Sequence, residues 1–244
     1  MVLIVSYNVK IFNSLDELSK YFSNYLSNQV DLSNDKFNLV LSGGSTPKHI
    51  FQYIALHFKE KIDWNRINIF WGDERCVPPN SPESNFKMSD ESLLSKINIP
   101  EKNIFRIKGE DNPDEEAERY SKAIEQNVTL ENSKPRFDLI MLGLGEDGHT
   151  ASIFPDQLRL LEDENIYSVS VHPGTKQNRI TITGKVINNA KNIIFIATGK
   201  NKSKIVSEIL NNKNHTKKYP ADFIIPVNGN MIWLLDEAAA SLLV

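Results

Sequence analysis

Short apolar runs, most of them followed within two residues by glycine, limit the fold of this 244-residue chain more than any other feature. Five of these runs are as long as a strand and rich in β-branched residues and Phe, as the buried strands of a parallel sheet are. They are FNLVL (37–41), INIFW (67–71), FDLIML (137–142), NIIFIA (192–197) and MIWLL (231–235).

Helical patterns separate these runs. Residues 14–30 begin with Ser14 as N-cap and Glu17 three residues later, the pattern of a capping box. Residues 114–128 begin with acids, and residues 200–210 begin with lysines. Such alternation predicts an α/β fold with a mostly parallel sheet and helices on both faces. We expect one domain over residues 1–244, with a small inserted lobe around 145–190.

Glycines mark the edge of the sheet where a ligand is expected. Seven of the 11 glycines follow four of the five predicted strands: Gly43, Gly44, Gly72, Gly143, Gly145, Gly148 and Gly199. In a parallel sheet these loops all emerge at the carboxyl edge, where α/β proteins bind ligands. The sequence therefore predicts that four loops, distant along the chain, converge on one pocket.

The first loop, LSGGSTPKHIFQYI (41–54), has the features of an anion site. Gly43 and Gly44 let backbone amides approach a ligand, and Ser45 and Thr46 add hydroxyl groups. We expect Thr46 to cap a helix that starts at Pro47. Phosphate is the expected guest, although a turn that only caps a helix has the same pattern.

The second loop, FWGDERCVPPNSPESNF (70–86), places charged residues directly after a strand. Arg75 can clamp a phosphate or stabilise a developing oxyanion. Asp73 can accept sugar hydroxyls or position a water molecule. A structural ion pair among Asp73, Glu74 and Arg75 is the alternative, and Cys76 is expected only to pack.

The third loop, GLGEDGHTASIFP (143–155), has the G-x-G-x-x-G spacing of a dinucleotide-binding turn. Pro155 follows too soon for the long helix that such a turn needs, and the acids would repel a pyrophosphate. The loop instead favours His149 as a general base oriented by Asp147. The other histidines His57, His172 and His215 are expected to be ordinary surface residues.

Basic residues complete the set. Arg179 begins the alternating segment NRITIT (178–183), and Lys200, Lys202 and Lys204 follow Gly199. Any of these lysines can neutralise a phosphate, and any one of them alone is equally compatible with a solvated surface.

Composition narrows the choice of partner and compartment. A net charge of −3 and a pI near 6.0 give no indication of a nucleic-acid or membrane partner. The single cysteine allows no intrachain disulfide and no cysteine-based zinc cluster, which suits a reducing compartment. No apolar run approaches the ~18 residues that cross a bilayer. We therefore expect a cytoplasmic protein.

Seven motifs in this order resemble the 6-phosphogluconolactonase family, from about residue 37 to the C-terminus. They are SGGSTP, WGDER, SNF, GLGEDGHTASIFP, RITIT, TGKNK and VNGNMIWLLDEAAA. The resemblance implies a three-layer α/β/α fold with a Rossmann-like sheet, shared with glucosamine-6-phosphate isomerases. It also implies hydrolysis of 6-phospho-D-glucono-1,5-lactone to 6-phospho-D-gluconate in the oxidative pentose phosphate pathway. Phe154 stands where the isomerases have a carboxylate, and DER replaces their DEY, so the lactonases are the better match.

The resemblance also suggests a role for each candidate residue. Phosphate is expected on Gly43, Gly44, Ser45, Thr46, Arg179 and Lys202, the last chosen because the family's lysine aligns there. His149 is expected to activate water, Asp147 to orient His149, and Arg75 to stabilise the oxyanion, without a metal or other cofactor. The expected partner is a small sugar-phosphate lactone, and the oligomeric state stays open, a monomer being compatible with the sequence. A sugar-phosphate sensor without turnover, or a nicotinamide oxidoreductase, is the alternative.

Overall fold

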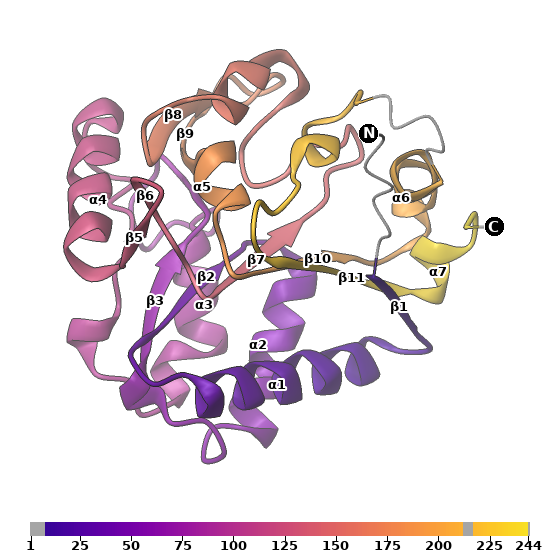
Figure 1. The fold of residues 1–244 in the computed structure, drawn as a ribbon, viewed down its shortest axis with the longest axis horizontal. Helices are drawn as coiled ribbons and strands as arrows, with labels where there is room; N and C mark the ends of the chain where they lie inside the picture. Colours follow the sequence, from indigo (N-terminus) through magenta and orange to yellow (C-terminus); the bar gives the residue numbers. More distant parts are fainter. Residues whose placement is uncertain (1–7, 212–216, 244) are drawn as a thin grey trace.

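The computed structural model describes residues 8–211 and 217–243, and its centre is a parallel sheet (Figure 1). In this part of the chain the sheet has six strands in the order β1-β11-β10-β7-β2-β3, and every neighbouring pair is parallel. The strands are β1 (Asn8–Phe12), β2 (Phe37–Leu41), β3 (Ile67–Trp71), β7 (Leu139–Gly143), β10 (Asn192–Ala197) and β11 (Asn230–Asp236). All five predicted strands are confirmed.

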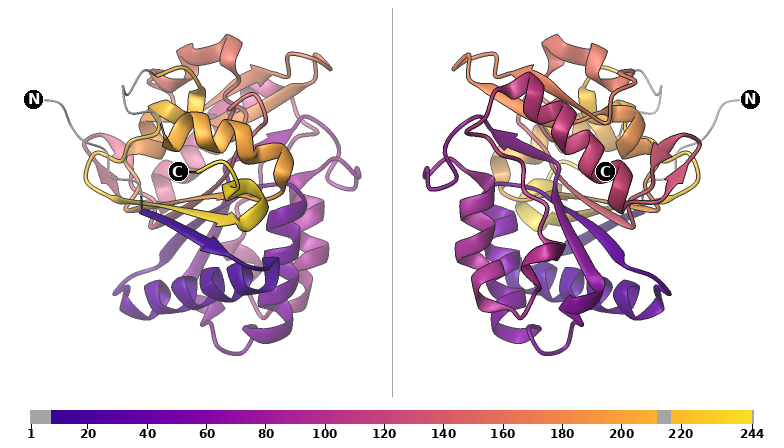
Figure 2. Two further views of the ribbon diagram at one scale, coloured as in Figure 1. Left: turned by 90° about the vertical axis from the view of Figure 1, so that its right-hand side faces the viewer. Right: turned by 90° about the vertical axis from the view of Figure 1, so that its left-hand side faces the viewer.

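Helices cover both faces of this sheet (Figures 1 and 2). On one face α1 (Leu15–Leu32) packs against α2 (Ser45–His57), and α2 packs against α3 (Asn85–Ser92). The other face carries α5 (Gly184–Asn188) and α6 (Ser203–Leu210), with α7 (Glu237–Ala240) beside the end of β11. The three-layer α/β/α prediction is therefore confirmed.

A second, antiparallel sheet lies above the carboxyl edge of β3. Its order is β4-β9-β8, formed by β4 (Asp73–Arg75), β9 (Asn178–Ile182) and β8 (Tyr167–Val171). Helix α4 (Pro113–Asn127) packs against β8 and β9. Since β4 follows β3 almost directly, this small sheet ties the region of the expected lobe to the rest of the fold.

The four helices that the sequence predicts are present, and one of them begins earlier than expected. Ser14 caps α1 by accepting a hydrogen bond from the Glu17 amide at 3.2 Å, as expected. The prediction that Thr46 caps a helix starting at Pro47 is wrong, because α2 already begins at Ser45. Gly44 adopts a φ of 109°, which an L-residue rarely takes, and so turns the chain into the helix earlier.

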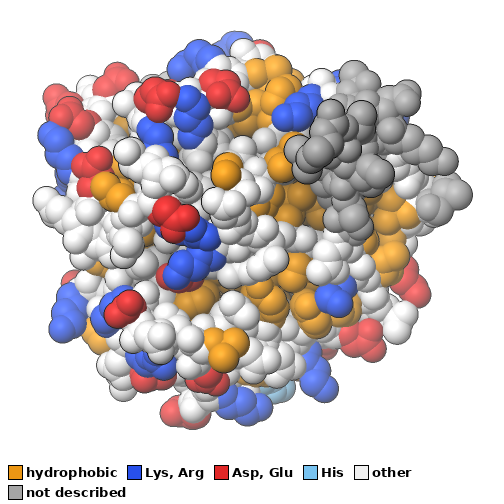
Figure 3. All heavy atoms as spheres, viewed as in Figure 1, with side chains coloured by type: hydrophobic (Ala, Val, Ile, Leu, Met, Phe, Trp, Pro, Cys, Tyr) orange, Lys and Arg blue, Asp and Glu red, His pale blue; other side chains and the backbone are white. Residues whose placement is uncertain are grey.

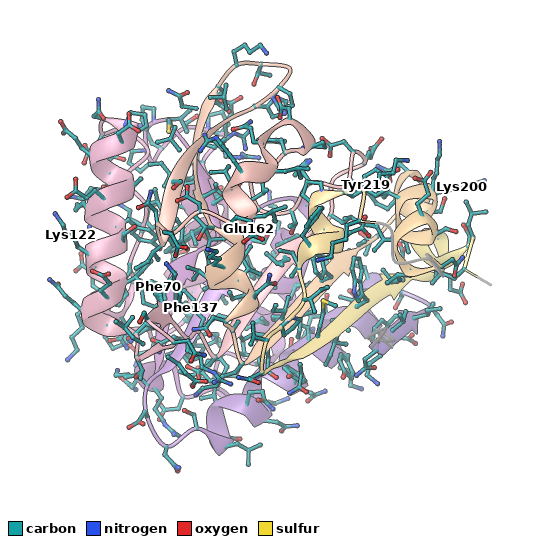
Figure 4. All side chains as sticks on the ribbon, turned by 45° about the horizontal axis from the view of Figure 1, so that its top comes forward. Phe70, Lys122, Phe137, Glu162, Lys200 and Tyr219 are labelled. Carbon is teal, nitrogen blue, oxygen red and sulfur yellow. The ribbon has the colours of Figure 1, made fainter. Side chains whose placement is uncertain are left out.

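Aromatic residues fix the end of β3, from which part of the site extends. Phe70 lies between Phe105, at 4.8 Å between ring centroids, and Phe137, at 5.3 Å (Figure 4 labels Phe70 and Phe137). The Trp71 amide donates to the Tyr120 hydroxyl at 3.0 Å, and the Tyr167 hydroxyl donates to the Trp71 carbonyl at 2.6 Å. Residues of α4 and β8 thereby hold the strand end in place.

The surface carries both signs of charge. On the face shown in Figure 3, acidic and basic side chains are interspersed rather than gathered into one patch of a single sign. Within the described residues, no helix is both long enough and apolar enough to cross a bilayer.

Candidate active site

A cleft of about 320 Å³ opens at the carboxyl edge of the parallel sheet. It is bounded by the loops after β2, β3, β7 and β10 and by β9, so the four glycine-containing loops do converge. The sequence-predicted residues that line it are Gly43, Gly44, Asp73, Arg75, His149, Arg179 and Lys202.

His149 and Asp147 form a hydrogen-bonded pair in the loop after β7. The Nδ1 atom of His149 lies 2.6 Å from Oδ1 of Asp147, which also accepts the His149 amide at 3.1 Å. Gly145 makes room for both side chains, because a Cβ there would lie 2.1 Å from the His149 Nδ1. The pair leaves the other ring nitrogen of His149 available to the cleft.

Electrostatics keep Asp147 ionised. Partial burial opposes its charge, but hydrogen bonds from the His149 ring and amide, together with the charge of that ring, outweigh burial. The net effect lowers the pKa of the Asp147 carboxyl to about 2. A carboxylate beside an imidazole stabilises the imidazolium that forms when the ring takes up a proton.

The loop does not form a dinucleotide-binding turn. Residues 149–154 after Gly148 are not helical, and the next helical segment is the short 3₁₀ helix Pro155–Leu161. A dinucleotide turn needs a helix that starts at once and points its amides at the pyrophosphate.

Two arginines face each other across β4 and β9. Arg75 and Arg179 are directly paired in the strand register, so their like charges lie on neighbouring strands. Each Nε is buried and has no hydrogen-bond partner in the described part of the chain. Burial, and then the charge of Arg75, lower the pKa of Arg179. Such an arrangement suits a guest with more than one negative charge.

Lys202 adds a third positive charge to the cleft. It is half-buried and lines the cleft, whereas Lys200 and Lys204 are exposed. Lys200 extends from the start of the α6 region (Figure 4), and Lys204 lies 4.0 Å from Glu208. The structure therefore singles out Lys202 among the three lysines.

Asp73 is buried at the base of the cleft. Its Oδ2 accepts a hydrogen bond from the Ser152 hydroxyl at 2.5 Å, and its Oδ1 lies 3.4 Å from the Asn85 amide nitrogen. Among the described residues, no ion pair joins Asp73 or Glu74 to Arg75, so the alternative of a structural ion pair is wrong.

Ser45 and Thr46 lie beside the cleft rather than in its lining. Ser45 borders an adjacent hollow that also contains Gly44 and Arg75. The Thr46 hydroxyl is 2.6 Å from the Thr198 hydroxyl, a bond that links the loops after β2 and β10. Their expected contacts with phosphate stay predictions.

A larger hollow, of about 500 Å³, lies at the opposite, amino edge of the sheet. Two of its cations pair with carboxylates: Lys191 lies 2.7 Å from Asp138, and Arg136 contacts Glu131. The smaller cleft is the better candidate because, among the described residues, no ion pair joins Arg75, Arg179 or Lys202 to a carboxylate.

Comparison with known proteins shows the family of this chain. Residues 13–233 match the family described as "Glucosamine-6-phosphate isomerases/6-phosphogluconolactonase". The chain belongs to this family.

Two curated relatives carry the name 6-phosphogluconolactonase. The protein from Treponema pallidum is 43% identical over 171 residues, covering 70% of this chain and 71% of the relative. The protein from Haemophilus influenzae is 42% identical over 211 residues, covering 86% and 89%. Among solved structures, 6-phosphogluconolactonase from Leishmania guyanensis superposes with a TM-score of 0.88 at 27% identity, over 98% of this chain and 100% of that one.

Phe154, at the position where the resemblance leads us to expect a carboxylate in isomerases, packs against the ring of His149, 4.9 Å between centroids. An apolar ring at this position offers no group for the ring-opening step of an isomerase.

The sequence predicted no role in the site for two residues, Glu74 and Asn85. Glu74 is buried and accepts hydrogen bonds from the amides of Arg75, Asn85 and Phe86 and from the Ser84 hydroxyl. Burial raises the pKa of Glu74, although these bonds oppose the shift. Asn85, so positioned, lines the cleft. The signal for both was present in the motifs WGDER and SNF.

The prediction for His172 is wrong. This residue was expected to be an ordinary surface residue, but it is half-buried and lines the cleft. The turn at the end of β8 brings His172 into the cleft. The sequence around this histidine is polar and does not predict that position. His57 is exposed as expected, and His215 lies outside the described residues.

Proposed function

We propose that this protein is a lactone hydrolase that converts 6-phospho-D-glucono-1,5-lactone to 6-phospho-D-gluconate, using His149 to activate water. One observation carries the proposal: a His–Asp pair and three cations, none of them in an ion pair with a described carboxylate, face the same cleft. The names of the relatives support the same substrate.

The cations account for the phosphate. Arg179 on β9 and Lys202 after β10 bring positive charge to the cleft beside Arg75 on β4, and the amides near Gly43 and Gly44 add neutral donors. Guanidinium groups bind phosphate oxygens through paired N–H donors, which makes such contacts both strong and directional.

The His–Asp pair accounts for the chemistry at the carbonyl. The free nitrogen of His149 takes a proton from water, and the water oxygen forms a bond to the lactone carbon. Arg75 stabilises the resulting oxyanion. The bond from that carbon to the ring oxygen then breaks, and the proton on His149 passes to the ring oxygen to give the hydroxyl acid. The lactone is an activated ester, so these groups suffice without a covalent intermediate.

Acid release from freshly prepared lactone tests the proposal. The rate in excess of spontaneous hydrolysis should be large for the lactone, and glucosamine 6-phosphate should not react. His149→Ala should lower kcat by about 10²–10⁴, the range for loss of a general base. His57→Ala is the matched control, because His57 is exposed and outside the cleft.

Two outcomes would contradict the proposal. Binding of the product without any excess hydrolysis would favour a sugar-phosphate sensor. A fall in kcat of less than about fivefold in folded His149→Ala would exclude His149 as the base.

A further inference from the structure

His172 lies on the same wall of the cleft as His149, with one aromatic ring between them. Its ring meets Phe154 edge-on, with 5.2 Å between centroids and an interplanar angle of 72°. The Phe154 ring contacts His149 at 4.9 Å. Both histidines line the cleft, yet the steps described above use only His149.

Hydrogen bonds determine which nitrogen of the neutral His172 ring carries hydrogen. The backbone amides of Gly174 and Thr175 both donate to Nδ1, each at 3.1 Å. A nitrogen that accepts cannot carry the proton, so the hydrogen of the neutral ring is on Nε2. Among the described residues, Nε2 has no hydrogen-bond partner, so it remains a donor for a ligand.

The chain on both sides of His172 is fixed. Gln157 donates to the Val171 carbonyl at 2.5 Å and accepts the Val171 amide at 3.0 Å. Beyond the turn, Gln177 donates to a carboxylate oxygen of Glu83 at 2.9 Å, and the Glu83 carbonyl accepts from Arg75. These hydrogen bonds fix the position of the His172 Nε2 donor relative to Arg75. A preorganised specificity contact requires such a fixed position.

We propose that His172 donates from Nε2 to a hydroxyl group of the sugar, between the phosphate and the reacting carbonyl. The inference rests on the proposed function. Arg179 and Lys202 match the charged phosphate and Arg75 matches the oxyanion, whereas a neutral N–H donor matches a neutral hydroxyl oxygen. His172 is thus a specificity-determining residue that contacts substrate without taking part in proton transfer.

Two substitutions distinguish donation from Nε2 to the sugar from the acceptance of hydrogen bonds at Nδ1 that supports the turn. In His172→Asn the amide oxygen takes the place of Nδ1 and still accepts from Gly174 and Thr175, but no donor remains at the Nε2 position. In His172→Gln the amide nitrogen reaches the Nε2 position, and the acceptor of the turn is lost.

The proposal predicts that the asparagine variant is the impaired one. His172→Asn should bind 6-phosphogluconate about fivefold to tenfold more weakly by calorimetry and raise KM for the lactone similarly, the worth of one neutral hydrogen bond. His172→Gln should stay within about threefold of the wild type. If His172→Gln were impaired and His172→Asn were not, His172 would only support the turn, and the proposal would be overturned.

Binding of inorganic phosphate separates the sugar contact from the phosphate contact. Wild type and His172→Asn should bind phosphate equally, and an equal loss for phosphate and 6-phosphogluconate would overturn the assignment to a hydroxyl. Nitrogen NMR of the ring should show hydrogen on Nε2, and hydrogen on Nδ1 would also overturn it. A wild type that binds 6-phosphogluconate but lacks lactonase activity would overturn the proposed function, while the same binding comparison would still decide the role of His172.

Discussion

At the scale of single residues, Gly145 determines whether the base and its carboxylate can meet. Gly145→Ala places a Cβ 2.1 Å from the His149 Nδ1 and 2.6 Å from an Asp147 oxygen, so the pair must separate. We expect kcat for the lactone to fall at least about 10²-fold, because an unsupported imidazole is a poor base.

A neighbouring glycine provides the control. Gly143 lies two residues earlier, at the end of β7, and a Cβ there would come no closer than 3.7 Å to the Ser42 hydroxyl. Gly143→Ala should retain activity within about threefold. Equal activity in the two variants would show that Gly145 has no role in placing His149.

Cys76 gives a prediction that depends on pH. Burial, and then the negative charge of Glu74, raise the pKa of its thiol to about 11 from 9.0. The thiolate is the reactive form, so its population at pH 8 is about 100-fold below that of an ordinary thiol, and it rises only as pH approaches 11. Alkylation by iodoacetamide, followed by mass spectrometry, should be slower than for free cysteine by about this factor. Reaction at the free-cysteine rate would contradict the burial of this thiol.

At the scale of elements, one carboxylate joins β4 to the start of α3. Glu74 accepts four hydrogen bonds, three from backbone amides and one from Ser84. Glu74→Gln replaces one acceptor oxygen by an amide nitrogen that faces donors. We expect the free energy of unfolding in urea to fall by about 2–3 kcal/mol, as for a buried charged hydrogen-bond group left unsatisfied.

An exposed acid on the same helix is the control for this element. Glu91, on α3, makes only a long contact of 3.9 Å with Lys87. Glu91→Gln should change the free energy of unfolding by no more than about 0.5 kcal/mol. If Glu74→Gln were equally mild, the link between β4 and α3 would have to come from elsewhere.

At the scale of the whole molecule, the two sheets meet at Trp71. The Tyr167 hydroxyl on β8 donates to the Trp71 carbonyl at the end of β3, and both residues are buried. Tyr167→Phe keeps the ring and leaves that carbonyl without its partner. We expect the free energy of unfolding to fall by about 1–3 kcal/mol, measured by urea denaturation. An unchanged midpoint would show that the small sheet is attached by packing alone.

The parallel sheet could be predicted from sequence because burial on both faces leaves a continuous apolar run. Strand β1 lacks that signal: it is an edge strand whose residues are only partly buried, and its sequence NVKIF alternates. Strand β8 was also missed, because its sequence YSVSV alternates instead of forming a continuous apolar run. It pairs with β9 across a turn.

The candidate site was predictable where glycines and charges mark loops after buried strands, as for Arg75 and His149. His172 was not, because its place depends on how far the turn after β8 extends over the cleft. Thr46 was misplaced as a cap because a glycine with positive φ can start a helix without a side-chain acceptor.

The paired arginines of β4 and β9 connect ligand binding in the cleft to the stability of the folded protein. The like charges of Arg75 and Arg179 repel each other, and a bound dianion offsets that repulsion by attracting both groups. A ligand that binds only the folded chain raises the free energy of unfolding by RT ln(1 + L/Kd), where L is the concentration of free ligand. The supply of phosphorylated metabolite would then regulate how long each molecule of the protein survives, in addition to how fast it works.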